Sequence, residues 1–164
     1  MNPETEELMQ QLEQPYEGAE MKPLYTAVVT VTPGSEEHAR MSGHAKSDDE
    51  LLTLDLAMPK ELGGRGQGTN PEQLFAAGYA ACFHGALALA ARKMRVDASQ
   101  SAVTCAITIG RDPEDGGYRL AAELQVKMPN SEREKAEQVI AQAHQLCPYS
   151  KAIAGNVDVK VAIF

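Results

Sequence analysis

The stretch from Thr69 to Phe83 reads TNPEQLFAAGYAACF, and it decides how the rest of the chain is organised. Asn70 suits the N-cap of a helix, and Pro71 suits the first helical position, where a backbone N–H would lack a partner anyway. Gln73 completes a capping-box-like start. We therefore predict a helix from Asn70 to about Met94. Its many alanines predict close helix packing, with an apolar stripe made of Phe75, Tyr79, Cys82, Phe83, Ala86 and Ala90.

Strands are predicted on both sides of this helix. Before it, β-branched and alternating apolar residues indicate three strands, at residues 25–32, 39–47 and 50–57. After it, the same signals and a Ser131 cap indicate a hairpin, a second helix and a last strand, at residues 103–109, 118–128, 131–146 and 156–163. Because strands and helices are segregated along the chain, we expect an α+β fold with mainly antiparallel sheets around two helices.

Composition and charge restrict the partners. The chain has 164 residues, 43% of them hydrophobic, and a net charge of −8. A negative chain is not expected to bind nucleic acid or an anionic membrane. No stretch approaches about 18 apolar residues, so no membrane span is expected. The start lacks the apolar core of a secretory signal, which favours a cytoplasmic protein. Residues 1–20 form an acidic arm, possible as a short helix, and 21–164 form the domain.

Three cysteines are the candidate reactive groups. An odd number without an export signal is a poor disulfide framework and favours a reducing compartment. Cys105 lies on the apolar face of a strand and is interpreted as structural. Cys82 lies about twelve residues into the long helix, whereas Cys147 precedes Pro148, where the second helix must break. No Cys-x-x-Cys pair occurs, so we expect no zinc. We also expect no other metal or cofactor.

A reactive cysteine must be a thiolate, and a free thiol is mostly protonated at neutral pH. Cys82 is too far from its helix start to gain from the helix dipole. A cation must therefore stabilise its thiolate, and arginine is the best candidate because it is always charged. Spacing alone does not identify which arginine this is.

Several motifs carry a specific resemblance. They are Met21-Lys-Pro-Leu-Tyr-Thr-Ala, Met58-Pro-Lys-Glu-Leu-Gly-Gly, the Thr69–Phe83 stretch, Cys147-Pro-Tyr-Ser150 and Gly155-Asn-Val-Asp-Val. Together they closely resemble the organic hydroperoxide resistance (Ohr) subfamily of the OsmC/Ohr family over about residues 21–164. Phe75-Ala-Ala-Gly-Tyr79 and Cys147-Pro-Tyr-Ser150 favour the Ohr branch over the OsmC branch.

The resemblance implies roles at matching positions. Cys82 matches the peroxidatic cysteine, Cys147 the resolving cysteine, and Glu72 the acid that orients the catalytic arginine. Arg40 best matches that arginine, although Arg40-Met-Ser-Gly stands where the family usually has Arg-Asp-Gly, and Arg65 is the alternative.

The resemblance also implies a reaction and partners. It implies a peroxidase that reduces organic (alkyl or fatty acid) hydroperoxides to alcohols through a Cys82 sulfenic acid and a Cys82–Cys147 disulfide, as a defence against oxidative stress. A dithiol, expected to be a lipoylated protein, would regenerate the enzyme. An alkyl chain would lie against Met58, Phe75, Tyr79, Phe83 and Tyr149.

An intertwined homodimer with composite sites is also implied. Glu72 and Cys82 stand ten residues apart on one helix, so about 15 Å along its axis. Their side chains cannot meet within one straight helix, so a partner subunit is expected to bring Glu72 to the thiol.

Three alternatives remain open. A cysteine hydrolase would use Cys82 or Cys147 with a histidine base; His144 stands one turn before Cys147, whereas His84 points to another face than Cys82. A metal site could be built from Cys82, His84, His144 and Cys147, with spacing unlike a zinc module. A non-enzymatic module binding an acyl or lipoyl group would use the cysteines for packing alone.

Overall fold

The computed structural model describes residues 2–164, apart from the side chains of residues 8, 9, 11 and 12. Four α-helices, one 3-10 helix and six strands follow one another along the described chain: α1 (Pro3–Glu13), β1 (Val29–Pro33), β2 (Ser42–Ser47), β3 (Thr53–Ala57), η1 (Lys60–Leu62), α2 (Pro71–Met94), β4 (Ala102–Arg111), β5 (Tyr118–Lys127), α3 (Arg133–Leu146), α4 (Pro148–Ile153) and β6 (Asp158–Ile163). The predicted α+β class is confirmed.

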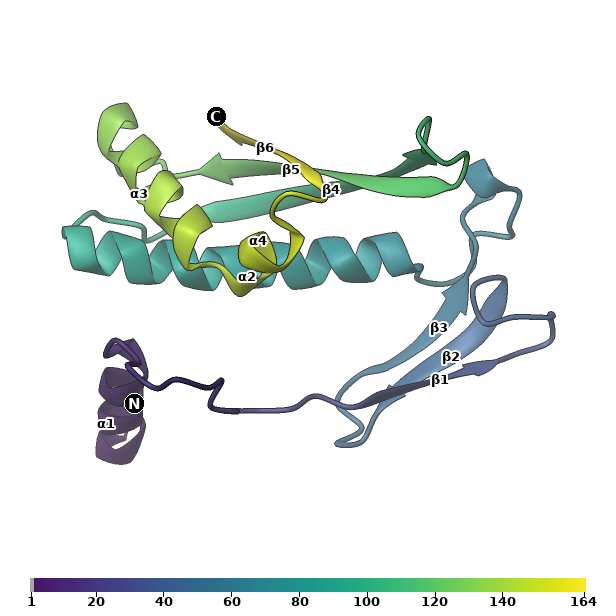
Figure 1. The fold of residues 1–164 in the computed structure, drawn as a ribbon, viewed down its shortest axis with the longest axis horizontal. Coiled ribbons are helices and arrows are strands. Elements are labelled where there is room, and N and C mark those ends of the chain that lie inside the picture. The colour runs from purple at the N-terminus through teal and green to yellow at the C-terminus, as the bar shows by residue number, and fades with distance from the viewer. Residues whose placement is uncertain (1) are drawn as a thin grey trace.

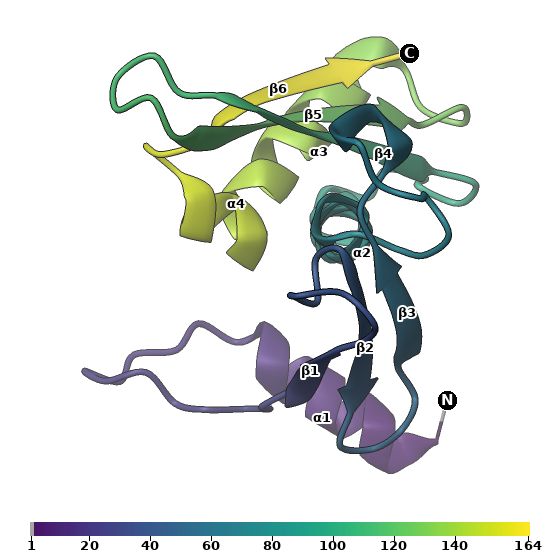
Figure 2. The same cartoon turned by 90° about the vertical axis from the view of Figure 1, so that its right-hand side faces the viewer.

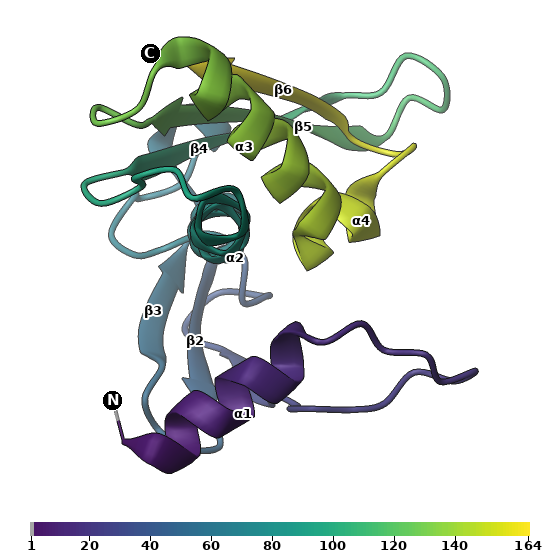
Figure 3. The same ribbon diagram turned by 90° about the vertical axis from the view of Figure 1, so that its left-hand side faces the viewer.

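Two three-stranded sheets lie on opposite sides of α2 (Figures 1 and 2). One has the order β1-β2-β3 and is antiparallel throughout. The other has the order β4-β5-β6, with β4 antiparallel and β6 parallel to β5. The pairing is therefore mainly antiparallel, as expected. Figure 3, with α2 almost end-on, places α3 and α4 beside α2 under the second sheet.

The long helix starts as its sequence predicts. The Asn70 side chain accepts a hydrogen bond of 2.9 Å from the Gln73 backbone N–H, and Pro71 follows at the first helical position. The helix ends at Arg95, which takes the left-handed conformation with φ 56°. One face of α2 packs against β4, β5 and α3 to form the core, through Tyr79, Phe83, Ala86, Leu87, Ala90 and Ala91.

The strands before α2 are shorter than predicted. Where a strand was predicted at residues 25–32, the paired strand is Val29–Pro33, and all five of its residues are exposed. Turns occupy residues 39–41 and 48–51, and Glu50 there has φ 63°. Local turn geometry, which β-propensity does not report, therefore ends these strands early.

The second helical region also differs from the prediction. Its N-cap is Glu132, with no side-chain cap, because the Ser131 hydroxyl donates to the Asp97 carbonyl instead, at 2.6 Å. The break before Pro148 is present. However, a short helix, α4, starts at this proline, since proline suits a first helical position as well as it ends a preceding helix.

Helix α2 corrects one expectation. An 18-residue window within Pro71–Met94 has mean hydropathy 1.6, so this helix is long and apolar enough to cross a membrane. The prediction that no such stretch exists was wrong, because alanines make the window apolar while each contributes little bulk. Only 33% of the window is buried in the single chain. Core helices of water-soluble proteins pass the same test, so this property alone does not indicate a membrane.

The outer face of α2 is made of small residues. Ala77, Ala81, Gly85 and Ala88 are all exposed. Such a face allows another helix to approach closely, because no bulky side chain separates the two axes.

Candidate active site

Two of the three cysteines lie together. The Cys147 thiol donates to the Cys82 sulfur at 3.4 Å, although 65 positions separate them in the sequence. Both are free thiols. Cys147 is fully buried and Cys82 is partly exposed. Helix α2 carries Cys82, and the break between α3 and α4 places Cys147 against it. The predicted pairing of these residues in space is therefore what the fold produces.

Backbone geometry fixes Cys147 at this break. Its N–H donates to the Ala143 carbonyl at 2.9 Å and its carbonyl accepts from the Lys151 N–H at 3.1 Å. Cys147 thus ends α3 and begins α4, with a non-helical ψ of 119°. The next turn carries the Tyr149 backbone N–H, which acts to lower the pKa of Cys82.

Within the single chain, the surroundings of Cys82 disfavour its thiolate. Burial raises the pKa of Cys82, and the adjacent Cys147 raises it further, whereas the Tyr149 N–H acts in the opposite direction. No arginine contributes. The sequence predicted that a cation must stabilise the Cys82 thiolate, and the chain on its own does not supply one.

Aromatic rings enclose the thiols on one side. Tyr149 stacks on Tyr79 with ring centroids 6.0 Å apart, and Phe75 meets both rings edge-on. Phe83 is fully buried and also packs edge-on against Tyr79. Four of the five residues predicted to line the substrate site, Phe75, Tyr79, Phe83 and Tyr149, thus form one cluster beside the thiols.

Ser150 and Gly78 also contribute to this cluster, although the sequence predicted no role for either. The hydroxyls of Tyr79 and Ser150 are hydrogen-bonded at 2.9 Å, which ties α2 to α4. Gly78 is the second: a Cβ there would lie 2.8 Å from the Tyr149 hydroxyl. Ser150 was visible only as part of the Cys147-Pro-Tyr-Ser150 motif, and no local signal marks Gly78 as a contact point.

Arg40 and Glu72 form a second group. Arg40, in the turn before β2, donates to Glu72 Oε1 at 2.7 Å. The Glu72 side chain is 13% exposed, and its other oxygen, Oε2, is buried with no hydrogen-bond partner among the described residues. The predicted Arg40–Glu72 association is present. The alternative arginine, Arg65, instead pairs with Glu36 at 3.1 Å on the surface.

The two groups do not meet within one chain. Glu72 opens α2 and Cys82 lies ten residues later, about 15 Å along the axis. Met58, the fifth predicted lining residue, lies with Arg40 and not with the aromatic rings. Cys105 borders a further cavity of about 530 Å³ that also contains Glu72. Cys105 itself is half-buried, and this burial raises the pKa of its thiol.

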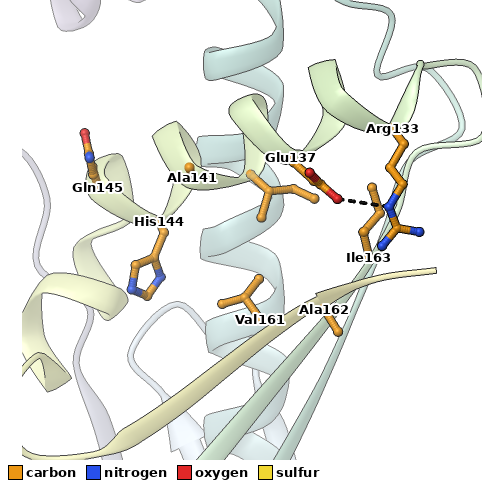
Figure 4. A pocket seen from close by; sticks show the side chains of 9 residues that line it. Arg133, Glu137, Ala141, His144, Gln145, Val161, Ala162 and Ile163 are labelled. Atoms are coloured by element: carbon orange, nitrogen blue, oxygen red, sulfur yellow. Dashed lines mark hydrogen bonds and ion pairs between the residues drawn. The ribbon is translucent and has the colours of Figure 1, made fainter.

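The histidine-based alternatives lack a suitable arrangement. His84 Nε2 lies 3.2 Å from the Ser101 hydroxyl, on an exposed face of α2. His144 lines a separate cavity of about 660 Å³ between α3 and β6, together with Val161 and the Arg133–Glu137 ion pair (Figure 4). Its Nδ1 is buried without a partner among the described residues, so no third group orients the ring.

A shared metal site receives no support either. In the part of the chain that the structure describes, no group of three or more His, Cys, Asp or Glu side chains is placed to hold a metal ion. The four candidates Cys82, His84, His144 and Cys147 therefore do not converge.

Known proteins of one family share this sequence and fold. The OsmC-like protein family matches residues 64–162. The organic hydroperoxide resistance protein OhrB of Bacillus subtilis is 43% identical over 85% of this chain and 98% of its own length. The organic hydroperoxide resistance protein of Xanthomonas axonopodis pv. citri is 43% identical over 87% of this chain and 96% of its own.

Solved structures agree with the sequence matches. The crystal structure of Bacillus subtilis OhrB superposes with a TM-score of 0.76, covering 87% of this chain and 100% of that one, at 43% identity. An organic hydroperoxide resistance protein from Legionella pneumophila gives 0.78 at 44% identity, covering 87% and 98%. The fold and the paired thiols thus define an OsmC-like protein. Within that class, the chain belongs to the Ohr subfamily of the OsmC/Ohr family.

Proposed function

We propose that this protein acts in resistance to organic hydroperoxides, as a cytoplasmic thiol peroxidase that reduces them to alcohols. One observation carries the proposal: the Cys82 and Cys147 sulfurs lie 3.4 Å apart. This arrangement occurs in a chain whose relatives are named organic hydroperoxide resistance proteins. Two thiols in contact can be oxidised to a disulfide with little backbone movement, since a disulfide needs its sulfurs about 2.05 Å apart.

The chemistry follows from thiol reactivity. The Cys82 thiolate attacks the distal oxygen of ROOH, the O–O bond breaks, and the alkoxide takes a proton to leave as an alcohol. Cys82 is then a sulfenic acid. The Cys147 sulfur attacks Cys82, a disulfide forms and water leaves. A dithiol, which we propose to be the lipoyl group of a lipoylated protein, reduces this disulfide by exchange and becomes a cyclic disulfide itself.

The cation comes from a second subunit in this proposal. The chain on its own raises the pKa of Cys82, whereas a working nucleophile needs the opposite shift. Arg40 is too far away in its own chain, but a two-fold symmetric dimer can bring the Arg40–Glu72 pair of one subunit to Cys82 of the other.

Surface features support such a dimer. The unpartnered Glu72 Oε2 leaves a buried acceptor for a donor outside the chain. The small-residue face of α2 and the exposed strand β1 offer apolar surface that one chain leaves uncovered. An intertwined homodimer would cover both.

Thiol counting tests the reaction directly. One equivalent of cumene hydroperoxide should remove two free thiols per chain and leave Cys105 free. Peptide mapping should find a Cys82–Cys147 link, and dihydrolipoamide should restore both thiols. A non-enzymatic acyl-binding or lipoyl-binding module predicts instead that peroxide leaves all three thiols titratable, and that result would reject the proposal.

A further inference from the structure

A cavity of about 660 Å³ opens beside Arg40, and one chain builds it entirely. Its walls come from the turn before β2, from the segment after β3 and from the β4–β5 hairpin. The lining residues are His38, Arg40, Met58, Leu62, Ile109, Gly110, Arg111 and Tyr118. Met58, Leu62 and Ile109 make part of the lining apolar.

The charge of this cavity is opposite to that of the protein. The chain carries −8 overall, yet the cavity is lined by two arginines and a histidine and by no aspartate or glutamate. Glu72 neutralises Arg40 at 2.7 Å. Arg111, by contrast, has no carboxylate within 4.0 Å among the described residues. The next residue, Asp112, pairs with Arg119 at 3.9 Å instead.

Arg111 is held in place by its sheet. It is the last residue of β4 and is paired across the hairpin with Tyr118, the first residue of β5. Its guanidinium carbon lies 4.8 Å from the centre of the Tyr118 ring, a cation–π contact that orients the planar group without neutralising its charge. The free edge of the guanidinium can therefore receive an anion in a bidentate geometry.

We propose that Arg111 is a specificity-determining residue that binds the carboxylate of a hydroperoxide substrate. The apolar part of the substrate lies along Met58, Leu62 and Ile109, and the hydroperoxide group is directed to Arg40. A long-chain carboxylic acid hydroperoxide has this combination of groups, with an anionic end, an apolar chain and a peroxide along it. The inference rests on the proposed peroxidase function.

The alkyl chain of such a substrate would lie on a different surface from the one that the aromatic rings provide. The rings enclose the thiols, whereas this cavity borders the Arg40–Glu72 pair. In a composite site the two surfaces would face each other, with the peroxide between them. Arg111 would then fix which end of the substrate points away from the thiol, because a guanidinium–carboxylate pair forms at one end only.

Substrate comparison in Arg111→Gln tests the inference. Linoleic acid hydroperoxide, its methyl ester and cumene hydroperoxide differ in whether a carboxylate is present. For the acid, kcat/KM should fall by about tenfold or more, because a charge-assisted hydrogen-bonded pair is lost. For the ester and for cumene hydroperoxide, kcat/KM should change less than about twofold. Arg65→Gln, at an exposed arginine paired with Glu36, is the matched control and should change none of the three.

A second variant guards against misfolding. Arg111→Lys retains the charge but not the fork, so it should keep part of the preference for the acid over the ester. Equal losses with the acid and the ester in either variant would overturn the assignment of Arg111. If wild-type thiols do not react with cumene hydroperoxide at all, the proposed peroxidase function has failed instead, and the two failures are thus distinguished.

Discussion

The two ends of the candidate active site differ in how complete they are within one chain. At the thiol end, Cys82 and Cys147 are in contact, and packed rings surround them. At the cation end, Arg40 and Glu72 are in contact, but Glu72 Oε2 is buried without a partner among the described residues, and a cavity opens beside the pair. One fold thus provides a redox pair and a charge pair separately. In our proposal, disulfide formation therefore needs one chain, whereas activation of the thiol needs two.

Substituting the thiols should have the largest effect. Cys82→Ser should reduce hydroperoxide consumption to the buffer background, because a hydroxyl cannot replace the thiolate nucleophile. Cys147→Ser should still react once per chain, but the product should be a sulfenic acid that further peroxide converts to sulfinic acid. Intact mass after one and ten equivalents of cumene hydroperoxide measures both outcomes.

Cys105→Ser is the matched control for these variants. It should form the Cys82–Cys147 disulfide as the wild type does, since Cys105 lies outside the thiol pair. A disulfide that requires Cys105 would break the distinction between the two ends.

Mixed dimers give the next largest effect. Arg40→Ala alone should slow Cys82 oxidation by about 10²-fold, as expected when a preorganised donor is removed from a reacting centre. Co-expressed Arg40→Ala and Cys82→Ser chains should regain activity, because a composite site can take its arginine from one subunit and its thiol from the other.

The recovered activity decides where the site lies. Purified mixed dimers should show up to about half of the wild-type rate, since one of two sites is intact. Mixed dimers as inactive as their parents would place Arg40 and Cys82 in the same chain, contrary to the separation seen here.

The sequence predicted the central helix and its start because Asn70, Pro71 and Gln73 act locally. Motif resemblance also predicted that Cys82 associates with Cys147 and Arg40 with Glu72, and both pairs are in contact, whereas their catalytic roles stay predictions. The sequence missed α4, because Pro148 begins a new helix as well as ending the old one, and it missed the ends of β1 to β3, because β-propensity does not report local turn geometry. The close approach of the Tyr149 hydroxyl to Gly78 and the hydrogen bond between Tyr79 and Ser150 join segments about 70 positions apart, and no local pattern reports such contacts.

The pH dependence of thiol alkylation sharpens the comparison further. In the Arg40→Ala variant, only the environment within the chain remains, and burial then holds the pKa of Cys82 above the ordinary thiol value. The neutral thiol is thus favoured in the folded state. Its contribution to stability is present below the ordinary thiol pKa and is lost as the pH rises through the raised value.

The iodoacetamide reaction rate, followed against pH by peptide mass, measures this shift. The midpoint for Cys82 should lie at higher pH in Arg40→Ala than in the wild type. Arg65→Ala should match the wild type. Identical midpoints in Arg40→Ala and the wild type would mean that another group ionises the thiol.

The smallest expected effect concerns the thiol end alone. Tyr79→Phe removes the hydrogen bond to the hydroxyl of Ser150, a residue that is 4% exposed, and leaves that hydroxyl unpaired in the interior. The loss should lower the free energy of unfolding by about 1–3 kcal/mol. It should leave the Arg40 dependence of alkylation unchanged, because the cation end keeps its contacts.

Urea unfolding followed by circular dichroism measures this loss of stability. Tyr25→Phe is the control: this tyrosine is 79% exposed, so the variant should unfold like the wild type. A Tyr79→Phe protein as stable as the wild type would show that the packed rings, and not this hydrogen bond, hold α4 and Cys147 against the long helix.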